Sequence, residues 1–221
     1  MSFSAQEIHY KIRNLSFRSR IVELSIGSEY YFKNLFKKKS SPYLFAAVGC
    51  FYFNPKARYQ GKWYELQPLG TEGQGLVGSP KEKYNRLQAL GMIGAGYKLG
   101  LSRRIHLSFE IGLRFTSTDY LDDVSTKYAD KGALRANGDM SPILADRSAE
   151  RDYNFASHLY IAQNSTFTKS YDSYGYASLK GYGQAGDQRG NPKNKDKYLI
   201  YSFTLSCRLY KMGLPTQFLL D

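Results

Sequence analysis

The most constraining feature of the sequence is a strict alternation of apolar and polar residues that begins at Ile105 and continues to Thr118. Successive side chains of a β-strand point to opposite faces, so this alternation predicts a strand with one apolar and one polar face. The polar face of the segment carries Glu110 and Arg114. The stretch 198–210 repeats the pattern, which indicates that the first strand is not an isolated case.

The same periodicity predicts an antiparallel, all-β fold. Strands are expected near residues 16–32, 43–53, 87–99, 105–118 and 198–210. Each of these stretches supplies at least the ~9–11 tilted residues that a membrane-spanning strand needs. The stretch 43–53 is apolar on both faces, so its inward side stays unassigned.

The connections between these strands alternate between short and long. The short ones are 33–42 and 100–104, and the long ones are 54–86 and 121–196. Structureless loops beyond ~12–15 residues are uncommon in compact soluble domains, whereas outer-membrane barrels combine short periplasmic turns with long extracellular loops. The spacing therefore predicts that the short connections face the periplasm and the long ones lie outside the cell.

An alternating sheet can have either of two polarities. In a soluble barrel or sandwich the apolar face points inward, and in a membrane barrel it faces lipid. The loop asymmetry, the strand lengths and the aromatic residues near strand ends favour an antiparallel outer-membrane β-barrel. The expected aromatic girdles are Tyr30, Phe32, Tyr43, Tyr97 and Tyr210 at the periplasmic edge and Phe51, Phe53, Tyr120 and Tyr198 at the outer edge.

Composition argues against several other classes of protein. No run approaches the ~18 consecutive apolar residues of a spanning helix, and 20 Tyr with 13 Phe argue against disorder. The net charge of +12 comes from cations scattered through the loops rather than from one stripe. We therefore expect no nucleic-acid partner, and contacts with lipopolysaccharide phosphates instead. Cys50 and Cys207, near opposite ends of their strands, are expected to be free thiols.

Charged residues on the polar faces of the strands would line the barrel interior. An eight-stranded interior is just wide enough to be filled by side chains, so charges there must be paired. We predict a polar network in the lumen, with Arg208 as the natural partner of Glu110. The members of this network are Glu23, Glu29, Glu110, Arg114 and Arg208. A structural role is expected, with a proton or ion path as the alternative.

The loops hold the residues expected to touch partners. Trp63, Tyr64 and Glu65 form the best contact cluster because aromatic residues are favoured at interfaces. Packing inside the loop is an equal alternative for this cluster. Asp122 and Asp123 lack the spacing of a calcium loop and are expected to meet a partner or loop cations.

The sequence predicts no catalytic set, metal site or cofactor. The glycine-rich stretch 70–75 lacks the strand-to-helix context of a phosphate loop, so a flexible loop is expected there. His9, His106 and His158 do not have metal-ligand spacing, and no acid stands out to orient His158 beside Ser157. We therefore expect no enzymatic activity.

Six stretches of rare composition follow one another along the chain: RNLSFRS (13–19), SPYLFAAVGCFYFNPKA (41–57), GKWYELQPLGTEGQG (61–75), TDYLDDVSTKY (118–128), LADRS (144–148) and RGNPKNKDKY (189–198). They resemble the PorG-like outer-membrane barrels of the type IX secretion system of Bacteroidetes, and the resemblance covers most of residues 13–210. It implies an outer-membrane protein that contributes to protein secretion and gliding motility. It also implies contact with periplasmic ring lipoproteins and no known enzymatic activity.

The sequence departs from this family in strand number. The family's barrels have eight strands and a cleavable signal, whereas five strands and no apolar signal segment are found here. Five strands cannot close a barrel, and an even strand count with both termini inside requires an odd number of further strands upstream. Three would restore eight. The chain is therefore expected to be truncated at its N-terminus, with Met1 an internal or misassigned start.

These inferences give one expected organisation. Residues 1–15 would be part of an outer loop, 16–210 the barrel domain and 211–221 a C-terminal tail. The predicted function is that of a structural or assembly component of type IX secretion in the outer membrane. The alternatives are a lipid-modifying or other outer-membrane enzyme, and a soluble basic β-barrel that binds a ligand or nucleic acid.

Overall fold

The computed structural model describes residues 13–33, 39–102, 104–150 and 169–207. Most of the predicted outer loop 1–15 and the whole predicted tail therefore lie outside the described residues. The chain divides into two compact units, which are described separately below. Unit 1 comprises Met1–Glu23, Phe51–Gln88 and Ser117–Asp196, and unit 2 comprises Leu24–Cys50, Ala89–Thr116 and Lys197–Asp221.

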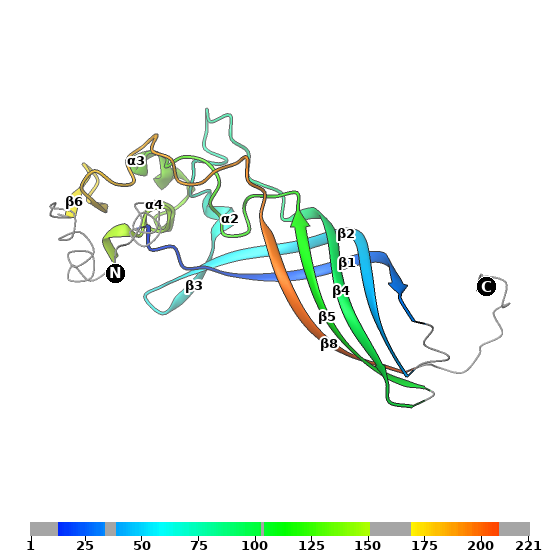
Figure 1. The fold of residues 1–221 in the computed structure, drawn as a ribbon. Coiled ribbons are helices and arrows are strands. Elements are labelled where there is room, and N and C mark those ends of the chain that lie inside the picture. Colours follow the sequence, from blue (N-terminus) through cyan, green and yellow to red (C-terminus); the bar gives the residue numbers. More distant parts are fainter. Residues whose placement is uncertain (1–12, 34–38, 103, 151–168, 208–221) are drawn as a thin grey trace. The chain divides into compact units, whose positions relative to one another are not determined.

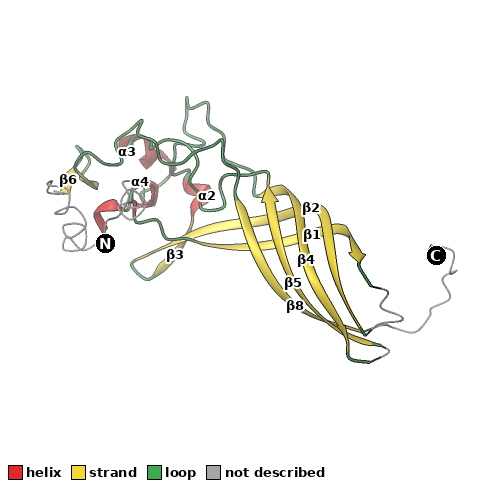
Figure 2. Cartoon of the chain, in the orientation of Figure 1, coloured by secondary structure: helices red, strands yellow, loops and turns green. Residues whose placement is uncertain are grey.

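One sheet contains the long strands of the chain (Figures 1 and 2). Its strands are β1 (Arg18–Tyr31), β2 (Ser40–Tyr59), β4 (Leu87–Gly100), β5 (Ile105–Thr116) and β8 (Lys197–Cys207), and they pair in this order. A short strand, β3 (Lys62–Glu65), pairs with the end of β2. The prediction of an antiparallel all-β fold is confirmed, and each stretch predicted to be a strand holds one of the long strands.

Backbone pairing defines the register of unit 2. β4 and β5 are antiparallel from Leu90 opposite Thr116 to Gly100 opposite His106. β5 and β8 are antiparallel from Ile105 opposite Cys207 to Phe115 opposite Lys197. Among the described residues, β1 and β8 each pair with one neighbour of the long-strand series, so the sheet is open at both edges.

The structure assigns the faces of β2, which the sequence left open. Tyr43, Phe51 and Phe53 share one face and are at most 1% exposed, whereas Leu44 and Val48 on the other face are exposed. The prediction that the first three belong to lipid-facing girdles is therefore wrong. The aromatic rings of these residues fill space inside the protein. The ring of Phe53, for example, stacks on that of Tyr84 within unit 1.

Where the structure describes them, the predicted long loops are folded segments of unit 1. Their short elements are α2 (Leu66–Leu69), α3 (Lys131–Leu134), η1 (Arg135–Asn137), α4 (Met140–Ala145), η2 (Ser148–Glu150), β6 (Lys169–Tyr171) and β7 (Ala177–Leu179). A small apolar core joins Ala57, Leu66 and Leu144. Among the described residues, none of the helices is long and apolar enough to cross a membrane.

Candidate functional site

The outward face of the sheet in unit 2 is apolar and exposed. Ile26 is 78% exposed, Phe203 77% and Leu205 69%. Phe109 stands opposite Phe203 in the β5–β8 register, with the ring centroids 5.1 Å apart. Contiguous apolar surface of this extent marks a contact with lipid or with another protein. Further exposed apolar residues of this face are Leu24, Leu44, Val48, Ile93, Leu99, Ile105, Ile111, Phe115, Leu199 and Tyr201.

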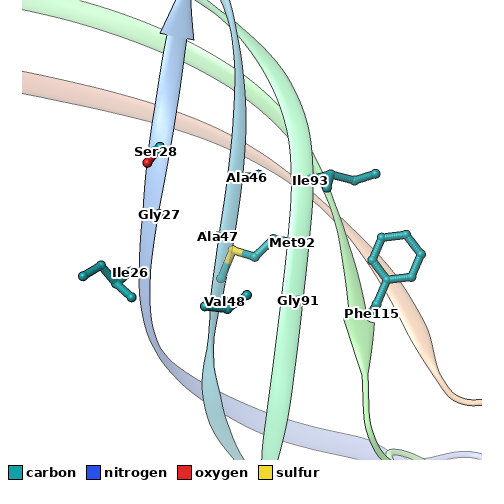
Figure 3. Close-up of a pocket in the computed structure, with 10 residues that line it drawn as sticks. All are labelled: Ile26, Gly27, Ser28, Ala46, Ala47, Val48, Gly91, Met92, Ile93 and Phe115. Carbon is teal, nitrogen blue, oxygen red and sulfur yellow. The ribbon is translucent and has the colours of Figure 1, made fainter.

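A shallow depression of about 390 Å³ is lined by residues of four strands of the sheet (Figure 3). None of its lining residues is charged. Burying an ionic ligand there would leave its charge unpaired, so the depression is suited to apolar chains. The lining residues are Ile26, Gly27 and Ser28 of β1, Ala46, Ala47 and Val48 of β2, Gly91, Met92 and Ile93 of β4, and Phe115 of β5.

The opposite face of the sheet is closed by aromatic rings lying over glycines. A Cβ atom at Gly96 would lie 2.5 Å from the ring of Tyr43, and one at Gly112 would lie 2.8 Å from the ring of Phe45. Only residues without side chains leave room for these rings at normal van der Waals distance. The inner face is therefore filled by side chains of its own strands.

Glu110 of β5 lies on this inner face within a hydrogen-bonded group. The hydroxyls of Tyr43 and Ser202 donate to its two carboxylate oxygens, the latter over 3.1 Å. Ser202 is the residue directly opposite Glu110 on β8. A carboxylate held by two hydroxyls is satisfied without a cation.

A second polar group joins β1 to β4. The Lys98 ammonium donates to Glu29 over 3.1 Å and to the hydroxyl of Tyr31, which itself donates to Glu29. The same ammonium lies 4.9 Å from the ring centre of Tyr31 and 5.1 Å from that of Tyr43. Lys98, which is not a member of the predicted lumen network, is thus the cation that pairs with Glu29.

The remaining members of the predicted lumen network are placed as follows. Glu23 is half-buried on β1, and Arg114 is half-buried and donates to the carbonyl of Gly112 on its own strand, over 2.9 Å. Arg208 lies outside the described residues. The register sets Ser202 opposite Glu110. The pairing of Glu110 with Arg208 stays a prediction.

The predicted contact cluster in unit 1 separates into exposed and internal residues. Trp63 is 48% exposed, whereas Tyr64 packs against the core of Ala57, Leu66 and Leu144. Glu65 pairs with Lys56 at 2.9 Å and Arg86 at 3.2 Å. The hydrogen bond from Lys56, together with that from Asn54, lowers the pKa of Glu65 to about 2. Partner contact remains a prediction for Trp63, and packing within the protein describes Tyr64.

Asp123, predicted to meet a partner or loop cations, is fully buried. Its carboxylate accepts hydrogen bonds from Thr71 at 2.5 Å and Tyr84 at 2.8 Å. This burial, which the sequence did not predict, raises the pKa of Asp123. Asp122 is half-buried and accepts from the backbone of Val124 at 3.0 Å. Burial, reinforced by the charge of Asp196, raises the pKa of Asp122 to about 6.

A buried ion cluster, absent from the sequence predictions, lies beside Asp123. Arg189 donates to Glu72 over 3.2 Å, to Thr71 over 3.0 Å and to the backbone oxygen of Asp123 over 2.7 Å. Glu72 also accepts from the backbone of Ser125, over 2.9 Å. The glycine-rich stretch 70–75 is thus largely buried and pinned, contrary to the flexible loop predicted. The sequence signal for this buried cluster is Glu72, a single acidic residue between Gly70 and Gly73.

Cys50 and Cys207 are free, as predicted. In the part of the chain that the structure describes, no three His, Cys, Asp or Glu side chains gather as a metal ion would require. Comparison of the chain with protein-family models, with curated proteins and with solved structures gives no match.

Proposed function

We propose that this chain is the membrane-embedded β-sheet and outer-surface region of an outer-membrane barrel protein. The observation that carries the proposal is the polarity of unit 2. Apolar side chains such as Phe203 and Leu205 are exposed, while Tyr43 and Ser108 on the opposite face are 1% and 2% exposed. A surface that faces hydrocarbon gains from this arrangement, as the lipid-facing side of an outer-membrane barrel does.

The proposed biological role is a structural or assembly component of type IX protein secretion. It is supported by the six stretches that resemble the PorG-like family. In this proposal the outward face contacts membrane lipid, and the turn between β4 and β5 faces periplasmic ring lipoproteins. The hydrogen-bonded groups around Glu110 and Lys98 hold strands together, and no enzymatic step is assigned to them.

The membrane proposal is tested with cysteine variants in which Cys50 and Cys207 are replaced by serine. A bimane label at Phe203→Cys should be quenched by brominated lipids in isolated outer membranes. The matched label at Ser202→Cys, one residue away on the inner face, should not. Equal quenching at the two positions, or quenching of both by aqueous iodide alone, would contradict a lipid-facing surface.

The secretion role needs a separate experiment. Deleting the gene from a bacterium with a type IX system should abolish export of a reporter that carries the secretion signal, and the gene in trans should restore it. A photo-crosslinking residue at Ser102 should form an adduct with a ring lipoprotein. Normal export in the deletion strain would exclude this role without affecting the membrane proposal.

A further inference from the structure

The tip of the β2–β3 hairpin (Figure 1) carries an exposed indole and two exposed cations. Arg58 stands opposite Trp63 in the register and shares its face, whereas Lys62 stands opposite Tyr59 on the other face. Gln60 and Gly61 form the two-residue turn, and both have positive φ angles, 45° and 83°. Paired positive φ angles are typical of the tight hairpin turns that match strand twist. The tip is therefore a defined turn, which fixes the backbone positions of Arg58, Lys62 and Trp63 relative to one another.

The charge at this tip is not compensated within the described residues. Arg58 and Lys62 are both exposed, and neither forms an ion pair with a described carboxylate. Glu65 is already neutralised by Lys56 and Arg86. The nearby Arg147 donates to the backbone oxygen of Arg58 and is itself paired with Glu150 at 2.7 Å. Two positive charges thus face solvent at the tip, Arg58 on the face of the indole and Lys62 on the opposite face.

The base of the hairpin explains why the tip is held outward. Tyr59 and Tyr64 pack on the apolar core of Ala57, Leu66 and Leu144. This anchoring uses one face of the hairpin and leaves Arg58 and Trp63 on the other. Trp63 consequently stays exposed although Tyr64, its neighbour in sequence, is packed.

We propose that this tip, defined by Arg58, Lys62 and Trp63, binds the phosphorylated sugar headgroup of an anionic glycolipid. A guanidinium and an ammonium provide charge-assisted hydrogen bonds to phosphate oxygens. An indole offers a flat apolar surface with a polar edge, which suits a sugar ring or a membrane interface. A convex tip with a single ring fits a small repeated headgroup better than a protein surface, which needs a broad apolar centre.

The inference rests on the proposed outer-membrane function, which supplies the glycolipid. It is tested on the 221-residue chain in detergent micelles, where Trp63 is the single tryptophan and reports on the tip directly. Adding diphosphoryl lipid A should shift the Trp63 emission to the blue and reduce its quenching by acrylamide. Phosphatidylcholine alone should leave both unchanged.

The double variant R58Q/K62Q should bind lipid A at least about tenfold more weakly and keep the emission spectrum of the unliganded chain. The matched variant K127Q/K193Q, which removes two exposed charges elsewhere in unit 1, should bind as the parent does. Trp63→Ala, measured by co-sedimentation with lipid A vesicles, should also weaken binding. If the two double variants lost the same affinity for lipid A, the proposal would be overturned, and binding would be due to the general positive charge of the protein.

Two further arms identify the source of the anion. Inorganic phosphate should compete with lipid A only at much higher concentration, because it lacks the sugar. Tighter binding of phosphate alone would overturn the headgroup assignment. Poly-L-glutamate that shifts Trp63 emission at lower concentration than lipid A would assign the tip to an acidic protein instead. If the lipid A experiments fail while brominated lipids still quench the bimane label at position 203, the headgroup inference is wrong and the membrane proposal stands.

Discussion

The two units of this protein have opposite polarity. In unit 2 the large apolar side chains of the sheet, such as Phe203 and Leu205, are exposed, and the polar side chains lie on the closed face. In unit 1 the apolar side chains Leu66, Leu134 and Leu144 are buried as in a water-soluble domain. A single sequence therefore follows two different burial rules.

The comparison shows that the surroundings, rather than the residue type, decide which side of an element is apolar. Burial of apolar area stabilises unit 1 against water. Apolar side chains on the outward face of unit 2 gain a similar stabilisation only if the surrounding medium is apolar. Even the ions differ: unit 1 buries Arg189 with Glu72, whereas the Glu29–Lys98 pair of unit 2 is partly exposed.

The largest expected effect tests the interior of unit 1. Arg189→Met removes the one cation that, among the described residues, forms an ion pair with the buried Glu72 carboxylate. Breaking a buried ion pair from one side costs about 3–5 kcal/mol. Urea unfolding followed by Trp63 fluorescence should therefore shift to much lower denaturant concentration.

Arg58→Met is the matched control, because Arg58 is exposed and has no ion pair among the described residues. It should change the free energy of unfolding by less than about 0.5 kcal/mol. If both variants lost the same stability, the buried cluster would not be what holds stretch 70–75 in place.

The second prediction tests the medium around unit 2. Phe203→Arg should cost about 2–4 kcal/mol of membrane-inserted stability, because a charge on a lipid-facing strand must leave water. Val77→Arg in unit 1 starts from a side chain that is fully exposed and should cost less than about 0.5 kcal/mol. Urea titration of outer-membrane vesicles measures both. If neither substitution changed the stability, unit 2 would face water, and the contrast between the units would be removed.

The third prediction concerns the closed face of unit 2. Gly96→Ala places a methyl group 2.5 Å from the Tyr43 ring and should lower stability by about 1–3 kcal/mol through overpacking. Gly91→Ala, on the same strand, has nothing within 4 Å of its new Cβ and should leave stability unchanged or slightly higher. Thermal unfolding in detergent, followed by circular dichroism, distinguishes the two. Equal melting temperatures would indicate that the inner face has spare room.

The sequence predicts unit 2 far better than unit 1, and the reason is the range of the interactions. Alternation along β5 and β8 depends on adjacent residues, so both strands and their faces can be predicted from sequence. The faces of β2 could not, because the Tyr43 and Phe45 rings pack on glycines of other strands, and no pattern within β2 reports that.

In unit 1 the decisive contacts join residues distant in sequence. Glu72 bonds to the backbone of Ser125 across 53 positions and to Arg189 across 117. The glycines around Glu72 indicate a turn, but only the fold reveals its partners. Similarly, Asp122 and Asp123 look like surface acids, and their burial follows from segments packing over them.

The smallest expected effect uses pH to separate the units further. Burial raises the pKa of Asp122 in unit 1 to about 6, above the ordinary value of an unfolded chain. The folded state therefore holds this proton more tightly, and its stability falls as pH rises from about 4 through about 6. Asp122→Asn keeps the oxygen that accepts from Val124 and removes the buried charge. It should stabilise unit 1 by about 1–2 kcal/mol at pH 7.5 and by almost nothing at pH 4. The gain is smaller than the full pKa shift would give, because the side chain is partly accessible to water.

Urea unfolding at the two pH values measures this, with exposed Glu82→Gln as the control that should change little at either pH. A gain at pH 4 equal to that at pH 7.5 would trace the effect to packing, and the burial of charge would then not distinguish unit 1 from unit 2.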